Sequence, residues 1–198
     1  SIAAGTEGLI VKSLSSKYAP GKRSMSWLKL KKDYLDSSVG DSIDAVIVGM
    51  AYGTGRNAGF FSSFLLAVPG PPGRGLQTIC CVGNLPAADL AGATDRLRNF
   101  TLPLADVPSD IEHSQLNSLG VDVWLKPEHR EVWEVKCADL TLSPTHTCAI
   151  GSRPDLEKAG IALRFPRLLR VRTPDDKDVA SATTALEVLR LYDSQAGR

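Results

Sequence analysis

The chain has 198 residues, of which 43% are hydrophobic and 23% charged, with a formal net charge of +1. This balance is typical of a folded globular protein and excludes a disordered tail, a collagen-like repeat and a disulfide-rich miniprotein. No run of 18 apolar residues occurs, which excludes a helical membrane span, and no secretory signal is visible at the start. The first residue is not methionine, so we expect the chain to begin inside a longer protein.

The charge is unevenly spread. Residues 1–36 contain seven basic and three acidic residues, whereas the remainder contains 16 basic and 19 acidic residues. A second basic cluster lies within that acidic remainder and consists of Arg164, Arg167, Arg170, Arg172 and Lys177. Two basic clusters on a nearly neutral protein predict an anionic partner that binds at defined places.

The four cysteines, Cys80, Cys81, Cys137 and Cys148, lack the spacing of a zinc site, and the three histidines are scattered. We therefore expect reduced, buried cysteines in a cytosolic or nuclear protein.

In chain order, the pattern predicts strands at 7–12 and 26–32. In the second, Leu28 and Leu30 share one face, and Trp27, Lys29 and Lys31 share the other. Neighbouring lysines on one face repel each other unless an anion binds there, although a solvated outer face explains the same pattern. A polar linker is predicted at 36–41.

Beyond the linker, strands are predicted at 43–52, 61–68, 76–82, 132–140 and 163–171. Helices are predicted at 87–97 and 182–192, the second capped by Ser181, and the polar segment 99–117 is expected to be a long surface loop. Five strands with a helix between the third and fourth favour a mainly β fold, namely a five-stranded Greek-key barrel of the OB type with short helices.

The sequence GTGRNA at 53–58 fits a dinucleotide-binding fingerprint. That fingerprint requires a following helix whose N-terminus holds the pyrophosphate, and here a strand follows instead. We interpret the segment as a glycine-rich hairpin with Arg56 exposed at its tip.

Three residues of the N-terminal region suggest nucleotidyl transfer. Glu7 could hold a divalent cation, because carboxylate oxygens suit Mg²⁺ bridged to phosphate, and Lys29 and Lys31 could neutralise phosphate charge. An exposed glutamate on a solvated strand is the alternative. Arg170 and Arg172 would suit bidentate phosphate binding, with a solvated basic face as their alternative.

Four strings of the chain together resemble the C-terminal part of the eukaryotic ATP-dependent DNA ligases, of the replicative DNA ligase I type. They are EGLIVK at 7–12, WLKLKKDY at 27–34, VWEVKCADL at 132–140 and LRFPR at 163–167. The resemblance implies that residues 1–36 are the last strands of an adenylation (nucleotidyltransferase) domain and that residues 39–198 form an OB-fold DNA-binding domain.

The first two strings resemble motifs IV and V of the nucleotidyltransferases. The resemblance implies that Glu7 associates with Mg²⁺ and that Lys12 is the basic residue closing motif IV. It also implies that Lys29 and Lys31 contact the α-phosphate of ATP, whose AMP becomes the covalent adenylate in the full-length enzyme.

The resemblance assigns the second basic cluster to DNA and to the end of the nucleotide. Phe165 would press into the minor groove beside a nick, with Arg164 next to it and Arg167 and Arg56 as further DNA contacts. Arg172, Asp176 and Lys177 look like motif VI, which orients the ATP pyrophosphate. Two more residues lie within this motif than in the family's spacing.

The family's adenylated lysine lies in a KxDG motif, which this sequence lacks, so the isolated fragment is expected to be inactive. The full-length parent is expected to be a nuclear enzyme that seals nicks in double-stranded DNA during replication, repair and recombination. It would work through enzyme–AMP and DNA–adenylate intermediates, with a sliding clamp or repair factors as candidate partners and no membrane. The alternatives are another covalent nucleotidyltransferase, such as an mRNA capping enzyme, and a stand-alone OB-fold module that stacks single-stranded bases on aromatic side chains.

Overall fold

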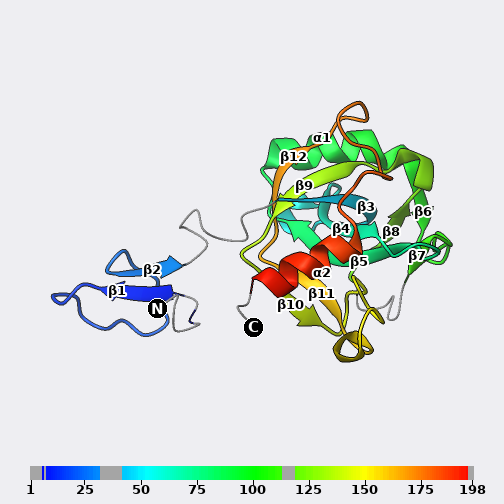
Figure 1. Ribbon diagram of the computed structural model, residues 1–198. Helices are drawn as coiled ribbons and strands as arrows, with labels where there is room; N and C mark the ends of the chain where they lie inside the picture. Colours follow the sequence, from blue (N-terminus) through cyan, green and yellow to red (C-terminus); the bar gives the residue numbers. More distant parts are fainter. Residues whose placement is uncertain (1–5, 7, 32–41, 113–118, 196–198) are drawn as a thin grey trace. The chain divides into compact units, whose positions relative to one another are not determined.

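The structure, a computed structural model, describes residues 6, 8–31, 42–112 and 119–195. The chain divides into two compact units, residues 1–40 and 41–198 (Figure 1). Glu7 and the linker predicted at 36–41 lie outside the described residues.

The first unit contains an antiparallel hairpin of β1 (Gly8–Lys12) and β2 (Trp27–Lys31). Apolar residues lie opposite each other on one face of the hairpin, Leu9 with Leu30 and Val11 with Leu28. All four are about half exposed within this unit. A two-stranded hairpin is only marginally stable alone in water. We therefore expect further protein surface to pack against this apolar face.

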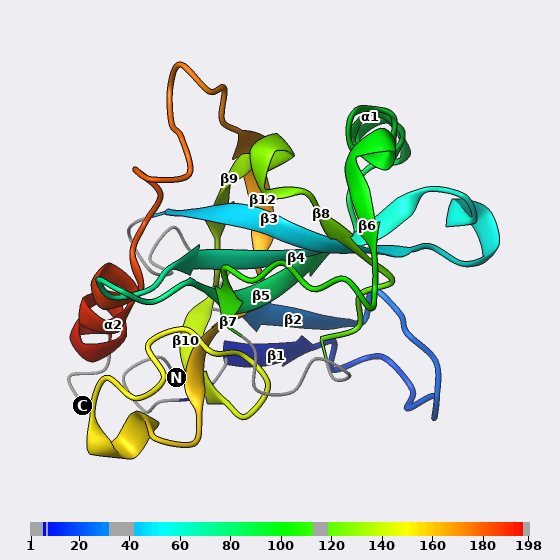
Figure 2. The same ribbon diagram turned by 90° about the vertical axis from the view of Figure 1, so that its right-hand side faces the viewer.

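The second unit contains the remaining elements (Figures 1 and 2). Its strands are β3 (Ile43–Tyr52), β4 (Phe61–Pro69), β5 (Leu76–Gly83), β6 (Thr101–Pro103), β7 (Ile111–Glu112), β8 (Val123–Leu125), β9 (Val132–Lys136), β10 (Asp139–Ser143), β11 (Gly160–Arg164) and β12 (Arg167–Val171). Its helices are α1 (Ala87–Leu97) and α2 (Ala185–Ser194), with short 3-10 helices η3 (Gly55–Asn57), η4 (Arg98–Phe100), η6 (Pro127–His129) and η7 (Pro154–Leu156). The predicted mainly β fold is confirmed.

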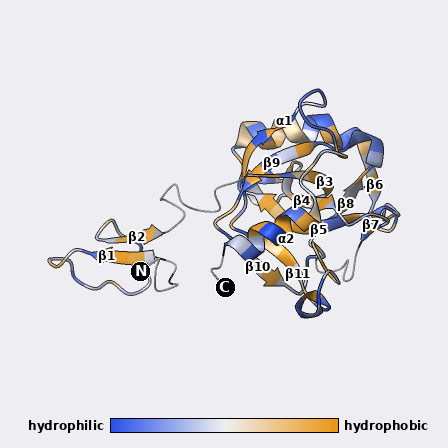
Figure 3. Ribbon diagram, in the orientation of Figure 1, coloured by the Kyte–Doolittle hydropathy of each residue, from blue (hydrophilic) through white to orange (hydrophobic). Residues whose placement is uncertain are grey.

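The core lies in a curled sheet with the strand order β12-β9-β3-β4-β5-β7. β3 is buried over its first eight residues, which are almost all apolar on both faces of the strand. Trp124, Trp133, Phe61 and Phe64 are fully buried around it. The hydrophobic colouring of the central strands in Figure 3 follows this core. Burial of these large side chains is the main force that holds the unit together.

A long two-stranded ribbon closes the barrel. β9 pairs with β12, and beyond a bend β10 pairs with β11. β9 also joins β3, whereas β11 reaches β5 through Cys148. The backbone N–H of Cys148 donates to the Thr78 carbonyl at 2.9 Å, and its carbonyl accepts from the Ile161 N–H at 2.8 Å. At Gly160 a Cβ would lie 2.3 Å from the His146 carbonyl oxygen, so only glycine permits this close approach.

The bend in this ribbon corrects two predictions. The predictions of single strands at 132–140 and at 163–171 are wrong, because each segment divides between two shorter strands. Phe165 has a φ of 52°, a left-handed conformation that no strand contains, and it separates β11 from β12. The Ala138 N–H still donates to the Arg164 carbonyl at 3.0 Å, so the two halves remain one ribbon.

The helices follow the predicted pattern with one correction. α1 has the predicted bounds and buries an apolar stripe that includes Leu90 and Leu97. α2 begins after Thr184, so the predicted cap Ser181 is wrong. The Thr184 hydroxyl accepts the Glu187 N–H, and the Glu187 carboxylate accepts the Thr184 N–H, which is a complete capping box.

The end of α2 is tied to the edge of β10. The Gln195 side chain accepts the Leu140 backbone N–H at 2.7 Å and donates to the Leu140 carbonyl at 3.0 Å. A side-chain amide thus occupies both backbone groups that Leu140 would offer to another strand.

Two further expectations concern the segment 99–117 and the cysteines. The described part of that segment contains β6 and β7, so the prediction of an irregular loop is wrong there. All four cysteines are free, and three are buried. Burial raises the pKa of the Cys137 thiol to about 11, which keeps it protonated at neutral pH. Within the described residues, no helix is long and apolar enough to cross a membrane.

Candidate functional site

Basic residues of the two hairpin strands lie on one face, opposite to the apolar one. Ile10 lies opposite Lys29, Lys12 lies opposite Trp27, and Lys31 holds the register position opposite Gly8. We call this surface the lysine face. The sequence pattern places Lys29 and Lys31 together, and the hairpin register adds Lys12 to them. Such a concentration of positive charge is suited to bind an anion.

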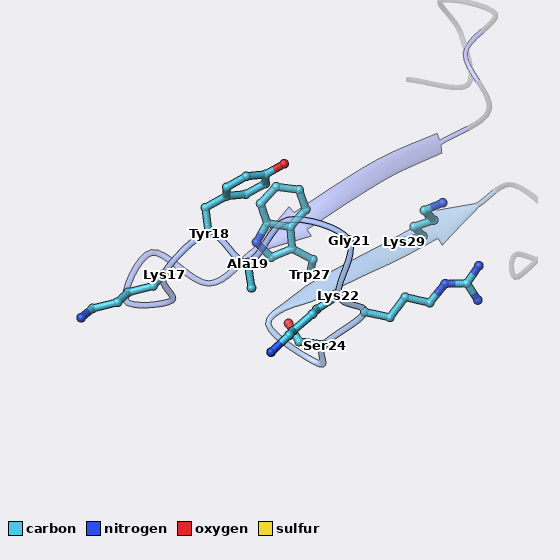
Figure 4. A pocket seen from close by; sticks show the side chains of 9 residues that line it. Lys17, Tyr18, Ala19, Gly21, Lys22, Ser24, Trp27 and Lys29 are labelled. Carbon is cyan, nitrogen blue, oxygen red and sulfur yellow. The ribbon is translucent and has the colours of Figure 1, made fainter.

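A pocket of about 550 Å³ opens beside the lysine face (Figure 4). It is lined by Lys17, Tyr18, Ala19, Gly21, Lys22, Arg23, Ser24, Trp27 and Lys29. Figure 4 shows the rings of Tyr18 and Trp27 side by side, with centroids 5.7 Å apart. The ammonium of Lys12 lies 4.2 Å from the Trp27 ring centroid, a cation–π contact that orients both side chains.

The cations of this pocket have no acidic partners among the described residues. Lys17, Lys22, Arg23 and Lys29 make no ion pair with any of them. Cations that have no acidic partner in the described part of the chain, next to aromatic rings, form a surface suited to a nucleotide or a phosphodiester. Tyr18, Lys22 and Arg23 are parts of this site that the sequence did not predict, although the excess of basic residues in 1–36 pointed to the region.

Within the part of the chain that the structure describes, no group of histidine, cysteine or acidic side chains is suited to hold a metal ion. Glu7, the residue predicted to associate with Mg²⁺, is outside that part.

The bend of the closing ribbon presents an aromatic side chain to solvent. Phe165 is 50% exposed even though phenylalanine is usually buried. Its positive φ costs on the order of 1 kcal/mol for a residue with a side chain. The Arg164 guanidinium lies 5.0 Å from the Phe165 ring centroid, and the side chain of Arg167 is exposed just beyond. Strain and exposure of one aromatic residue between two arginines indicate a binding role.

Arg56 lies where the sequence predicted it, exposed within η3 in the connection from β3 to β4. Tyr52 and Phe60, which flank this connection, are also exposed. The connection therefore offers a cation and two aromatic rings to solvent.

The basic residues at the end of β12 are bound by carboxylates. The Arg172 guanidinium donates to Asp44 from Nε at 2.8 Å and from Nη2 at 3.3 Å. It also contacts Glu134 at 3.2 Å and Asp176 at 3.0 Å. The hydrogen bond with Asp44 raises the pKa of Arg172 above its usual value. Arg170 contacts Glu134 through Nε at 2.6 Å but is 58% exposed, whereas all three guanidinium nitrogens of Arg172 contact carboxylates.

Lys177 joins the same cluster despite the longer spacing after Arg172. The Thr173 carbonyl accepts the N–H groups of both Asp176 and Lys177, at 3.0 and 2.9 Å, in a tight turn. This turn absorbs the extra residues and brings the Lys177 ammonium within 3.2 Å of Asp44. We call Asp44, Glu134, Arg172, Asp176 and Lys177 the ionic cluster.

The two acids that organise this cluster were not predicted from the sequence. Asp44 lies 128 residues before Arg172, and Glu134 lies in the neighbouring strand β9. The only signal for Asp44 is a charged residue at the start of a ten-residue apolar strand. Such a residue needs a buried counter-charge, which a single sequence does not identify.

The chain is similar to known proteins over nearly its whole length. Residues 57–177 match the model of the ATP dependent DNA ligase C terminal region, and residues 1–31 match that of the ATP dependent DNA ligase domain. DNA ligase 1 of Arabidopsis thaliana is 43% identical over 98% of this chain, which covers 24% of that protein. A DNA ligase of the archaeon Sulfolobus acidocaldarius is 41% identical over 98% of this chain, which covers 31% of that protein.

Among solved structures, the ligase domain of M. tuberculosis LigD has a TM-score of 0.52 with 27% identity. The likeness covers 92% of this chain and 48% of that one. The chain thus spans about a quarter to a third of the two curated relatives' length.

Proposed function

We propose that this chain is part of an enzyme that seals nicks in double-stranded DNA. The chain belongs to the ATP-dependent DNA ligases and contains their C-terminal region. The parent would adenylate its own lysine, transfer AMP to the 5′-phosphate, and let the 3′-hydroxyl displace it. This chain has no KxDG motif, so it would form no adenylate by itself. The register that brings Lys12, Lys29 and Lys31 to one face carries the proposal.

In this proposal the lysine face binds the nucleotide. Lys29 and Lys31 would contact the α-phosphate, where an ammonium offsets the charge that develops when the phosphoryl group is transferred. The neighbouring pocket would receive further phosphates through Lys22 and Arg23. Mg²⁺, when bound, would neutralise part of the same phosphate charge, and Glu7 is its proposed ligand.

The barrel unit would bind DNA on both sides of the nick. Phe165 would enter the minor groove, where an apolar wedge unstacks a base step, and Arg164 and Arg167 would contact the backbone. Arg56 would add a phosphate contact from the β3–β4 connection. Contacts of this kind give affinity without sequence preference, and nick sealing requires no reading of bases.

Each of the two units would belong to a different domain of the parent. Residues 1–36 would complete an adenylation domain, and residues 39–198 would form the OB-fold domain. The exposed apolar face of the hairpin supports this, because the rest of an adenylation domain would cover it. We further propose a nuclear location, roles in replication, repair and recombination, and recruitment of the parent by a sliding clamp or repair factors.

Binding of nicked duplex, intact duplex and single-stranded DNA, measured by fluorescence anisotropy at two salt concentrations, tests the proposal. We expect salt-sensitive binding that favours nicked duplex. Phe165→Ala should weaken that binding about tenfold, since a stacked or wedged aromatic contributes about 1–3 kcal/mol. Leu142→Ala, at a similarly exposed apolar residue of β10, is the matched control and should leave affinity unchanged.

A preference for single strands would replace the ligase proposal with an OB-fold single-strand module. Equal affinity of the Phe165→Ala variant and the unmodified chain would remove Phe165 from the DNA site.

A further inference from the structure

The carboxylate of Asp44 connects the two basic residues of the ionic cluster. It contacts the Arg172 guanidinium through both oxygens and the Lys177 ammonium through Oδ2 at 3.2 Å. Its side chain is only 9% exposed. The Asp44 backbone is fixed as well, because its N–H donates to the Thr183 hydroxyl and its carbonyl accepts the Thr183 N–H. Asp44 is therefore a rigid support for both cations.

Arg172 is almost fully engaged inside the protein. Its side chain is 13% exposed, and each of its three guanidinium nitrogens contacts a carboxylate of Asp44, Glu134 or Asp176. To bind a phosphate group, Arg172 would have to give up its contacts with the nearly buried carboxylates of Asp44 and Glu134. Asp44 would then keep only Lys177 as a counter-ion, and Glu134 only Arg170. Breaking a buried pair in this way is strongly unfavourable. Arg172 is thus placed to hold Asp44 rather than to bind a ligand.

Lys177 has the opposite character. Its side chain is 32% exposed, and among the described residues its ammonium forms an ion pair with Asp44 alone. An ammonium has three N–H donors, so one contact with Asp44 leaves donors for a second anion. Asp44 fixes the position of this cation while its remaining donors face solvent.

We propose that Asp44 is a positioning residue for nucleotide binding, which presents the Lys177 ammonium to the pyrophosphate of ATP while Arg172 locks Asp44 in place. The inference rests on the ligase function proposed above and divides the roles of the two cations. Lys177 touches the nucleotide, whereas Arg172 acts through Asp44. Loss of the Asp44 charge would leave two neighbouring cations that repel each other, and Lys177 would move away into solvent.

The test uses the full-length parent and separates two reactions. Formation of the enzyme adenylate from labelled ATP requires the pyrophosphate contact, whereas sealing of a nick that already carries AMP does not. We expect Asp44→Asn to raise the KM for ATP about tenfold, as for the loss of one ordered charge-assisted hydrogen bond. Sealing of the adenylated nick should keep its rate. A merely structural defect would instead impair both adenylation and sealing.

A double-mutant cycle then shows whether Asp44 acts through Lys177. Lys177→Met should also raise the KM for ATP about tenfold. The variant that combines Asp44→Asn with Lys177→Met should behave like Lys177→Met alone, because Asp44 has no cation left to position. The matched control is Arg96→Met, which removes a bidentate pair with Glu131 outside the cluster and should leave both reactions unchanged.

Each outcome bears on the inference. An additional effect of Asp44→Asn in the Lys177→Met background would overturn it, as would an equal loss in adenylation and sealing. If Asp44→Asn does not fold, Asp44→Glu keeps the charge but displaces it by one methylene group. That variant should then raise the KM for ATP while sealing persists, and an unchanged KM would overturn the inference. Failure of the unmodified parent to form an adenylate would instead refute the proposed function itself.

Discussion

The stability of the barrel should fall as the pH is lowered from 7 to 5, because of one partly buried histidine. His146 lies directly before the segment that connects β5 to β11. Its Nδ1 atom is inaccessible to solvent and has no hydrogen-bond partner within the described part of the chain. Burial lowers the pKa of His146 from 6.5 to about 4. The folded protein therefore keeps this imidazole neutral at a pH where the unfolded chain protonates it.

The sign and size of the effect follow from proton linkage. Because the folded pKa lies below the unfolded pKa, His146 contributes stability that is present above pH 6.5 and lost as the pH falls toward 4. Between pH 7 and pH 5 the loss is about 2 kcal/mol. The carboxyl groups of Asp110 and Glu187, whose pKa values are lowered, stay charged in this range and lose their contribution only below about pH 4.5.

Urea unfolding followed by tryptophan fluorescence measures this change, because Trp124 and Trp133 are fully buried in the barrel unit. We expect His146→Gln to remove most of the difference between pH 7 and pH 5. His129→Gln, which replaces a histidine stacked on the Phe100 ring, is the control and should leave the difference unchanged. The same pH dependence in His146→Gln and in the unmodified chain would refute the reasoning.

Two further predictions concern the lysine face and a nearly buried arginine. In the full-length parent, Lys29→Ala and Lys31→Ala should each slow adenylate formation by at least about 100-fold, since they would remove charge at the reacting phosphate. Lys158→Ala, at an exposed position of the barrel unit, is the control, and unchanged adenylation rates in the first two variants would exclude the phosphate assignment. Asp110→Asn should lower the free energy of unfolding by about 2 kcal/mol, because the Arg130 side chain is only 2% exposed and loses its bidentate partner. Thermal unfolding measures this loss, and Asp155→Asn, in an exposed pair with Arg153, should change stability by less than about 1 kcal/mol.

Local patterns in the sequence predicted the elements whose determinants are local. The apolar run from Ile43 to Tyr52 and the helical stripe from Ala87 to Leu97 have the predicted bounds, because turn residues or proline flank each segment. The cap of α2 was also readable, since Thr184 and Glu187 have the spacing of a capping box. Ser181 lacks that spacing, because the residue three positions after it is Thr184 and not a glutamate or glutamine.

The features that the sequence did not reveal depend on distant contacts. The bend at Phe165 has no glycine to mark its positive φ, so the backbone there follows from the closure of the barrel. Alternation within one strand placed Lys29 beside Lys31, but the addition of Lys12 required the register of the hairpin. The partners of Arg172 come from two other strands, and no local pattern links a residue to a counter-charge 128 positions away.

The contact between Gln195 and Leu140 links the docking of α2 to the behaviour of the molecule toward other chains. An edge strand with open N–H and carbonyl groups is a template on which a second polypeptide can add. The Gln195 side-chain amide makes the two hydrogen bonds that a neighbouring strand would make with Leu140. It can make them only while α2 stays packed on the barrel. Release of the helix would open that edge at Leu140. The attachment of this last helix and the protection of the domain against strand-mediated self-association are therefore one and the same property.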